Sequence, residues 1–359
     1  MIKELKLINF RNFDKLLLES LNKENFIIWE NWKWKTNILE AISILWNNSI
    51  TWIKLNNLVK KWTKNFLIEY INNNWDKISF SYTTDTNKEW QIIAQKRFKL
   101  NNNKISKKKF NSITYKCVIF SPITMNMMYL SPNLRRDFLD NILKSSFSEY
   151  EQLLLDYKKI LKSRNKTLKS IHEWKCSKNE INFWNEKFIE LSTLIYRYRF
   201  KIINFLQSSI SSTAEYFSWK IKNVEFIYNT KVFENNIEID IKDYINKNID
   251  RDIILWKTHI WPHVDDFEIK IDWVNLINFA SRWETKSIII WLKLLEWIFI
   301  EKMTNKKPLL IIDDLISELD KKHKDILFKK IEYYQTFISS IMKKDIKNNA
   351  INDSNIIRI

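Results

Sequence analysis

Glycine is missing from this sequence of 359 residues. Average usage near 7% would supply about 25 glycines to a chain of this length. Glycine is the residue that takes positive φ angles and tight turns without steric cost. A chain without glycine therefore either avoids such turns or carries another residue at them. Tryptophan, normally rare, occurs 17 times and is the residue to examine.

Cysteine and long apolar runs are also scarce. Cys117 and Cys176 lie far apart and match no metal-binding or redox spacing, which excludes a disulfide framework and a zinc ribbon and predicts a reducing compartment. No apolar run reaches the roughly 18 residues that a membrane span needs. The N-terminal residues alternate lysine with apolar residues, unlike a signal peptide. We therefore expect a soluble, cytoplasmic protein with no membrane partner.

Positive charge is abundant. The formal net charge of +17 favours a polyanionic partner, most often nucleic acid, although a solvated basic surface is the alternative. Two basic runs are candidates for DNA binding: Lys107, Lys108 and Lys109, and Lys159, Lys162 and Lys166. Each run could contact phosphate or face solvent. Neither contains base-reading chemistry, so binding through them would be salt-sensitive and independent of sequence.

The placement of the tryptophans suggests what they stand for. Asn74-Trp75 and Asp272-Trp273 each lie between two strand-like runs, where Asn-Gly or Asp-Gly would form a tight hairpin turn. Some bacterial lineages read the UGA codon as glycine, and a richness in Asn, Lys, Ile, Phe and Tyr suits an AT-rich genome. We infer that most of these tryptophans are glycine in the cell. Individual positions can still be tryptophan, and Trp184, within a helical pattern, is the first candidate for one.

The coarse pattern predicts an α/β core interrupted by helices. Short apolar runs read as strands, at residues 2–10, 16–18, 26–28, 66–71, 78–82, 91–94, 115–120, 309–312 and 336–339. Helices are expected from near residue 35, over about 282–303 and over about 321–334. Residues 132–211 read as mostly helical, with two long antiparallel helices on either side of a polar stretch near 172–180. Residues 224–275 read as strands, and residues 104–109 as a basic loop.

A phosphate-binding loop is the first candidate site. It follows a strand, precedes a helix, and spans Trp29, Glu30, Asn31, Trp32, Lys33, Trp34, Lys35 and Thr36. With glycine at 29, 32 and 34 it becomes G-x-x-G-x-G-K-T, a P-loop whose backbone N–H groups would cradle ATP phosphates. Lys35 would then reach the β- and γ-phosphates, and Thr36 would bind Mg²⁺. The alternative is a chance strand–loop–helix junction.

A buried strand ending in two acids is the second candidate. Asp313 and Asp314 follow the run 309–312, as in a Walker B segment, where Asp313 would hold Mg²⁺ and Asp314 would face the attacking water. A helix cap is the alternative. The third candidate is Ser281 with Trp283 and Glu284 at a helix start; with glycine at 283 it gives Ser-x-Gly, an anion site. An ordinary serine cap with Glu284 as partner is equally good locally.

The order of these segments decides between the alternatives. A P-loop, a late Ser-x-Gly helix start, Walker B and then Ser317 to Asp320 form the layout of an ABC-type ATPase head. Other segments resemble the RecF family: Phe-Arg-Asn at 10–12, Phe-Ser-Pro at 120–122, Ser-Pro-Asn-Leu-Arg-Arg-Asp-Phe-Leu-Asp at 131–140, and Trp-Pro-His-Val-Asp-Asp at 261–266. The chain differs from the family at Ile123 and Thr124, where acids are usual, and at Tyr129 and Leu130, where Lys-Gly is usual. For His263 with Asp265-Asp266, structural hydrogen bonding is favoured over a metal site.

The resemblance implies an SMC/RecF-like head from residues 1–120 and 276–359, with an inserted helical lobe at 121–275. It implies ATP and Mg²⁺ as cofactors and an ATP-dependent homodimer, closed in trans by Ser281, Trp283 and Glu284, with Ser317 and Asp320 at the seam. It further implies slow hydrolysis with Asp314 as general base. The dimer would bind double-stranded DNA at single-strand gaps and junctions, with RecR, RecO and RecA as partners in DNA damage repair, replication and the SOS response.

Two other functions stay open. If the tryptophans are literal, Trp29 and Trp34 would fill the phosphate space, and the chain would be a basic DNA-binding structural protein without ATPase activity. Another SMC-like ABC ATPase acting on different DNA structures is the second alternative, although the short insert argues against SMC proteins, whose arms are far longer.

Overall fold

The computed structural model describes residues 1–28, 32–45, 54–86, 92–210, 223–259, 262–316, 319, 321–340 and 354–358. The chain forms two compact units: the first contains Met1–Met125 and Asn305–Ile359, and the second contains Asn126–Thr304. The second unit takes in residues 276–304, which the sequence analysis assigned to the head, because their long helix packs on helices of the insert. The functional division at 120 and 276 stays a prediction.

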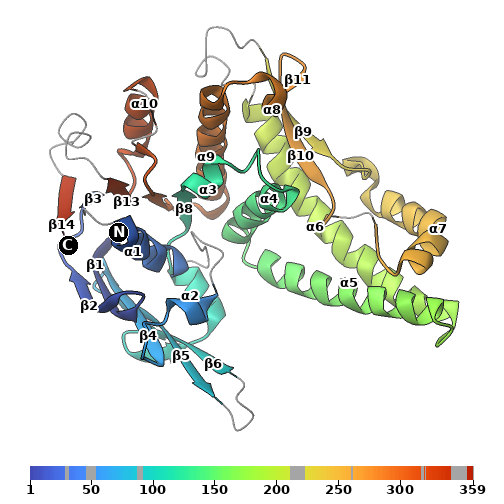
Figure 1. Cartoon of the computed structure of the whole chain (residues 1–359), viewed down its shortest axis with the longest axis horizontal. Helices are drawn as coiled ribbons and strands as arrows, with labels where there is room; N and C mark the ends of the chain where they lie inside the picture. The colour runs from blue at the N-terminus through green and yellow to red at the C-terminus, as the bar shows by residue number, and fades with distance from the viewer. Residues whose placement is uncertain are drawn as a thin grey trace. The chain divides into compact units, whose positions relative to one another are not determined.

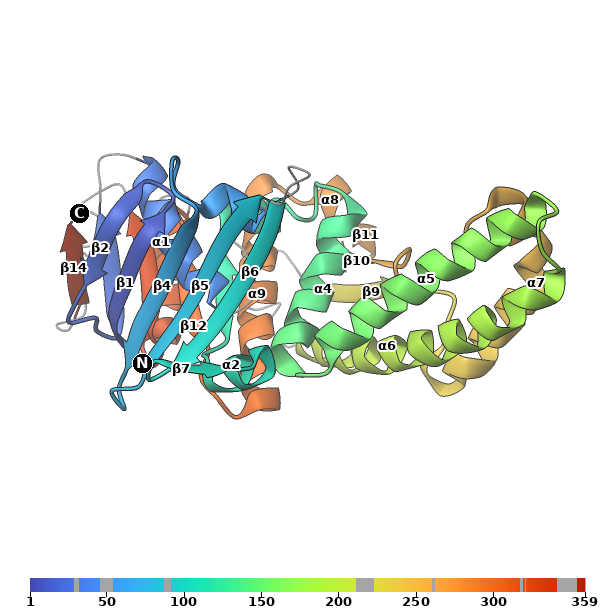
Figure 2. The ribbon, with the colours of Figure 1, turned by 90° about the horizontal axis from the view of Figure 1, so that it is seen from below.

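An antiparallel sheet forms one half of the first unit, with strands in the order β2-β1-β4-β5-β6-β7 (Figure 2). Its strands are β1 (Ile2–Phe10), β2 (Phe13–Leu18), β4 (Asn65–Asn72), β5 (Lys77–Thr86), β6 (Ile92–Leu100) and β7 (Asn103–Ile105). Alternate residues of β4 are buried, namely Phe66, Ile68 and Tyr70, as expected for a strand with one face on a core. Of the residues 104–109 predicted as a basic loop, 104 and 105 end β7 and 107–109 begin the helix α2 (Lys107–Ile113), which Ser106 caps by accepting a hydrogen bond from the Lys109 N–H.

A parallel sheet forms the other half, in the order β14-β3-β13-β12-β8. Its strands are β3 (Glu24–Ile28), β8 (Cys117–Phe120), β12 (Leu309–Ile312), β13 (Thr336–Ser340) and β14 (Ser354–Arg358). Besides α2, the described helices of this unit are α1 (Trp32–Ile44), α3 (Pro122–Met125), α10 (Lys321–Ile331) and the short 3₁₀ helix η1 (Leu55–Leu58). Figure 1 shows β14, from the red end of the chain, beside β3 from the blue end. Four-residue strands that are buried throughout, such as β12, are typical of a parallel sheet interior.

The second unit is mainly helical. Its helices are α4 (Pro132–Ser146), α5 (Tyr150–His172), α6 (Ile181–Ile210), α7 (Ile237–Leu255), α8 (Leu276–Phe279) and α9 (Arg282–Thr304), with short 3₁₀ helices η2 (Lys178–Glu180) and η4 (Glu234–Asn236). A small antiparallel sheet has the order β11-β10-β9, from β9 (Val224–Asn229), β10 (Asp266–Ile271) and β11 (Val274–Asn275). Helices α5 and α6 confirm the predicted long pair and lie side by side (Figure 2).

Helix α7 corrects the sequence analysis, which read residues 224–275 as strands throughout. The run Ile-Glu-Ile-Asp-Ile at 237–241 alternates like a strand. Its buried isoleucines are Ile237, Ile241 and Ile245, spaced by four, which is the repeat of a helix face. Ile239, which completes the period-two pattern, is 62% exposed, so that pattern does not reflect burial.

Among the residues that the structure describes, five tryptophans have left-handed backbone torsions: Trp62, Trp75, Trp174, Trp256 and Trp273, with φ between 54° and 73°. Asp272 and Trp273 form the two-residue link of the β10–β11 hairpin, with φ of 44° and 73°. Positive φ at both central residues is the requirement of a type I′ turn, which selects Asn-Gly or Asp-Gly. The hairpin turns predicted at 74–75 and 272–273 are both present.

Two more of these tryptophans end helices. The Trp256 residue follows α7, and the next N–H, of Lys257, bonds back to the Asp252 carbonyl at 3.2 Å. Trp174 follows α5 in the same way, with the Lys175 N–H on the Ser170 carbonyl at 2.8 Å. This is the Schellman arrangement, whose left-handed residue is usually glycine. Trp174 is 95% exposed, so no burial of its ring offsets the torsional cost.

Candidate nucleotide site

Four predicted site residues meet at one edge of the parallel sheet. Lys35 and Thr36 lie in the first turn of α1, which follows β3, while Asp313 and Asp314 follow β12. Strand β13 lies between β3 and β12. Because the carboxyl ends of parallel strands point the same way, residues far apart in sequence converge there, and ligands bind at such an edge in open α/β sheets.

The carboxylate of Asp313 is at the centre of this cluster. The Thr36 Oγ1 lies 3.4 Å from both Asp313 carboxylate oxygens, and the Ser339 hydroxyl donates to Oδ1 at 2.8 Å. Two oxygens that share a Mg²⁺ at 2.0–2.1 Å lie about 3 Å apart. Thr36 and Asp313 are therefore spaced as two ligands of one small divalent cation, and a hydroxyl with a carboxylate is a donor set that Mg²⁺ accepts.

Burial controls the charge of Asp313. Loss of hydration raises the pKa of its carboxyl to about 6; the Ser339 and Thr36 hydrogen bonds oppose this, and the Asp314 charge adds to it. At neutral pH the group is ionised, so it can bind a cation. A bound cation would stabilise the charged form further.

Lys35 is almost fully buried and its Nζ lies 3.7 Å from Asp314 Oδ1. Asp314 itself has a left-handed φ of 49°, and its N–H donates to the Ser339 hydroxyl at 2.8 Å. In this arrangement the Lys35 ammonium can bind an anion, and the Asp314 carboxylate can accept a proton.

Ser339 belongs to this site, and the sequence analysis missed it. It is the penultimate residue of β13 and contacts both carboxylates, at 2.8 Å for Asp313 and 3.3 Å for Asp314. The sequence did place Ser339 at the end of a predicted strand. That position indicates the site only once it is known that this strand lies between β3 and β12.

The rest of the predicted loop is only partly described. Trp29, Glu30 and Asn31 lie outside the described residues, and of Trp32 and Lys33 only the helical backbone is described. The Trp34 ring packs edge-on against Phe13, with ring centroids 5.1 Å apart, and joins the hydrophobic core. This placement differs from the expectation that the literal Trp34 fills the phosphate space.

Arg11, from the Phe-Arg-Asn segment, is bound to α1 through Glu40. Its guanidinium makes a bidentate contact to the buried Glu40 at 2.8 and 3.0 Å and donates to the Asn57 carbonyl. The segment thus fixes the helix that carries Lys35 and Thr36.

The third predicted segment, at the start of α9 in the second unit, forms a reciprocal cap. The Glu284 N–H donates to the Ser281 hydroxyl at 3.2 Å, and the Ser281 N–H donates to the Glu284 carboxylate at 2.8 Å. This is the ordinary capping box that the sequence left open. The Trp283 side chain is not described, and Ser317 and Asp320 lie outside the described residues, so their roles in trans stay predictions.

The basic runs lie on exposed helices. Lys107, Lys108 and Lys109 form the first turn of α2, and Lys159, Lys162 and Lys166 follow one exposed face of α5. Lys159 is paired with Asp156 at 3.2 Å. Among the described residues no helix is long and apolar enough to cross a membrane, and no group of three His, Cys, Asp or Glu could hold a metal.

The acids and histidine at 263–266 confirm the structural interpretation. Asp265 accepts hydrogen bonds from the Tyr196 and Tyr228 hydroxyls at 2.7 and 3.0 Å. His263 is hydrogen-bonded to Tyr157 at 2.6 Å, and burial lowers its pKa to about 4. Asp266 forms an ion pair with Arg135.

Comparison with known proteins gives one consistent result. The chain is 31% identical to the DNA replication and repair protein RecF of Thermoanaerobacter sp. (strain X514), over 97% of this chain and 96% of that protein. It is 28% identical to the protein of the same name from Clostridium kluyveri, over 99% and 96%. A solved structure of the recombination mediator protein RecF with ATP, in the RecFOR pathway, superposes with a TM-score of 0.86 at 29% identity, covering 100% and 95%. No family model matches the chain.

Proposed function

Because this chain belongs to the RecF family of DNA replication and repair proteins, we propose that it is an ATP-driven switch in recombinational repair and replication-fork maintenance. The observation that carries the proposal is the convergence of Lys35, Thr36, Asp313 and Asp314 at one edge of the parallel sheet. The geometry supports binding of a nucleotide phosphate beside a divalent cation.

The site residues divide the work of ATP binding and hydrolysis. Lys35 binds the β- and γ-phosphates, and Thr36 and Asp313 hold Mg²⁺, which neutralises phosphate charge. Asp314 orients the attacking water and accepts its proton as the bond to the γ-phosphorus forms and ADP departs. This loop requires close backbone approach, so the proposal includes glycine at positions 29, 32 and 34.

Association of two copies is the output of the switch. Ser281, position 283 and Glu284 of one subunit close on the γ-phosphate held by the other, with Ser317 and Asp320 at the seam. ATP then makes the dimer and slow hydrolysis releases it. The closed dimer binds double-stranded DNA beside a single-strand gap in the cytoplasmic nucleoid and helps RecR and RecO to place RecA. The similar RecF chain solved with ATP is a recombination mediator of the RecFOR pathway, which supports this part of the proposal by analogy.

Lys35→Ala tests the switch. ATP binding, ATP-dependent dimerisation and ATP-dependent binding to gapped duplex DNA should all be lost, because the ammonium is the buried cation of the site. The matched control is Lys330→Ala, an exposed lysine at the end of α10. DNA binding that is salt-dependent but indifferent to ATP, in both the parent chain and Lys35→Ala, would instead favour the structural DNA-binding protein.

A further inference from the structure

We propose that Tyr129 is a positioning residue for the helix start that carries Ser281, and that Arg135 and Asp266 hold the Tyr129 segment in place. The inference rests on the proposed role of Ser281 in ATP-driven association. All the residues involved lie in the second unit, so the contacts belong to a single compact body.

The first link is a chain of hydroxyl groups. The Tyr129 hydroxyl donates to Thr285 Oγ1 at 2.8 Å, and the Thr285 hydroxyl donates to the Ser281 carbonyl at 3.1 Å. Thr285 is fully buried, whereas Tyr129 is 43% exposed. Ser281 is therefore fixed from two sides: Glu284 binds its N–H and hydroxyl, and Thr285 binds its carbonyl.

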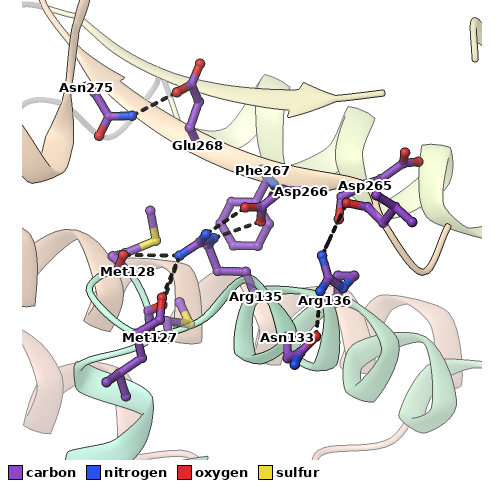
Figure 3. Close-up of polar contacts among 12 residues, drawn as sticks. Met127, Met128, Asn133, Arg135, Arg136, Asp265, Asp266, Phe267, Glu268 and Asn275 are labelled. Carbon is purple, nitrogen blue, oxygen red and sulfur yellow. Dashed lines mark hydrogen bonds and ion pairs between the residues drawn. The ribbon is translucent and has the colours of Figure 1, made fainter. Parts of the chain in front are cut away.

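The second link is the Arg135 guanidinium (Figure 3). It makes a bidentate contact to Asp266, with Nε at 2.8 Å and Nη2 at 2.6 Å. Its remaining nitrogen, Nη1, reaches the carbonyls of Met128 and Leu130, each at 3.2 Å. These two carbonyls flank Tyr129 in sequence. The planar fork of arginine thus joins the start of β10 to the backbone on both sides of Tyr129.

Arg136, the next residue of α4, binds the backbone just before β10. Its Nη1 donates to the Asp265 carbonyl at 3.0 Å, and its Nη2 to the Asn133 side chain at 2.5 Å (Figure 3). The Arg-Arg segment of α4 and the Asp-Asp segment before β10 therefore meet, although about 130 residues separate them. A shift of the small sheet would move the Tyr129 segment through the Arg135 contacts to Asp266 and to the Met128 and Leu130 carbonyls.

The consequence is a defined route from the small sheet to the γ-phosphate of the other subunit. The route runs from Asp266 through Arg135 and Tyr129 to Thr285, and ends at Ser281. Its effect falls on association rather than on nucleotide binding, because the segment acts on ATP held by a second copy. Tyr129 occupies a position where lysine is usual in the family. In this chain the contact to the start of α9 is therefore a hydrogen bond between two neutral hydroxyls, those of Tyr129 and Thr285.

Tyr129→Phe and Thr285→Val, alone and together, test the route. Each is made in a protein whose tryptophan positions carry the residues that occur there in the native host. ATP-dependent self-association, measured by sedimentation with ATP and Mg²⁺, should shift to a roughly three- to tenfold higher protein concentration, which corresponds to one net hydrogen bond. The double variant should be no weaker than Thr285→Val. Arg135→Lys, which lacks the fork, should show a shift in the same direction.

Three readouts separate positioning from a plain loss of structure. ATP affinity at low protein concentration and the unfolding free energy of Tyr129→Phe should match the parent chain, and a raised protein concentration should restore its hydrolysis rate. Tyr333→Phe is the control, because this exposed tyrosine contacts Lys23 and Lys307 through its ring. A Tyr129→Phe chain that associates like the parent overturns the inference, as does one that is only less stable. A parent chain that fails to associate with ATP overturns the proposed function instead.

Discussion

At the scale of single residues, the backbone and the side chain disagree at five tryptophans. A left-handed φ costs a residue with a Cβ roughly 1–2 kcal/mol. When the indole ring is exposed, no burial of apolar surface offsets this cost. Trp62, Trp174 and Trp273 are each at least 75% exposed. Glycine takes these torsions freely, and all five positions are turn or helix-end positions where glycine is usual.

We therefore expect peptide mass spectrometry of the protein from its own host to find glycine at 62, 75, 174, 256 and 273, and at the loop positions 29, 32 and 34. At the first five positions the reason is the left-handed φ. At 29, 32 and 34 the reason is that a P-loop backbone must approach the phosphates closely. Trp184, in the first turn of α6, is the internal control and should have the mass of tryptophan. Tryptophan masses at the five left-handed positions would contradict the recoding, and tryptophan at 29, 32 and 34 would remove the ATPase proposal.

Asp313 gives a second residue-scale prediction. Its folded-state pKa of about 6 lies above the reference value of 3.8, so the folded chain binds a proton more tightly than the unfolded chain does. The raised value makes the carboxylate costly above pH 6, and this cost disappears below pH 3.8. Asp313→Asn should therefore gain about 2 kcal/mol of unfolding free energy relative to the parent between pH 4.5 and pH 8, without Mg²⁺.

Denaturant titrations of both proteins at the two pH values measure this difference. Added Mg²⁺ and nucleotide should reverse the order at pH 8, because the cation stabilises the parent carboxylate and not the amide. Parallel pH profiles for parent and variant would show that Asp313 does not carry the shifted pKa.

The site shows which residues a sequence reveals. Lys35, Thr36, Asp313 and Asp314 were predictable, because each lies in a short segment whose spacing and flanking strand carry the chemistry. Ser339 was not predictable, because it joins the site through the neighbouring position of β13 and not through any local pattern. The Arg135–Asp266 contact was equally hidden, although both segments had been recognised separately.

At the scale of elements, the spacing of apolar residues along the sequence predicted helices correctly where the apolar face was wide. It failed where that face was narrow. The long helices α5 and α6 were predicted, and α7 was not, because isoleucines at every second position imitate a strand. Helix α2 was read as a loop because its first turn is lysine and its start depends on the Ser106 cap.

A buried ion pair joins α5 to α7. Arg164 Nη1 lies 2.9 Å from Asp252, and neither side chain is more than 2% exposed. Arg164 also bonds to Asn185 of α6 and to Thr258. Removal of one partner leaves a buried charge without compensation, so Arg164→Met should destabilise the second unit by about 3 kcal/mol or more in a denaturant titration.

The double variant Arg164→Met with Asp252→Leu is the informative control. Because it removes both charges, it should recover most of the loss. Arg197→Met, on α6 outside this cluster, should change the stability little. A double variant as unstable as the single one would show that packing around Arg164, and not its charge, holds α5 to α7.

At the scale of the whole molecule, the net charge of +17 is spread over surfaces whose targets the fold alone does not identify. The α5 face with Lys159, Lys162 and Lys166 is exposed and regularly spaced. Each phosphate contact contributes about 0.9 to the slope of log affinity against log salt concentration. Changing all three lysines to glutamine should therefore reduce that slope by about 2 to 3 for duplex DNA of any sequence.

The same change at Lys107, Lys108 and Lys109 of α2 is the matched comparison, since it removes equal charge from another exposed helix. Fluorescence anisotropy over a series of salt concentrations gives both slopes. An unchanged slope for the α5 variant would assign that face to solvent. Equal losses for both variants would point to net charge and not to a defined contact surface.

The strand order of the parallel sheet also has a consequence for synthesis. Strand β3 leaves the ribosome early, but its two neighbours, β13 and β14, come from the last part of the chain. The second unit, residues 126–304, is complete before either neighbour exists. Vectorial folding should thus run out of sequence order: the inserted lobe folds first, and the nucleotide site is assembled only after β13 and β14 have been synthesised. A nascent chain stalled near its end would contain a finished lobe beside an unfinished catalytic sheet, and such a chain would be a natural client for chaperones.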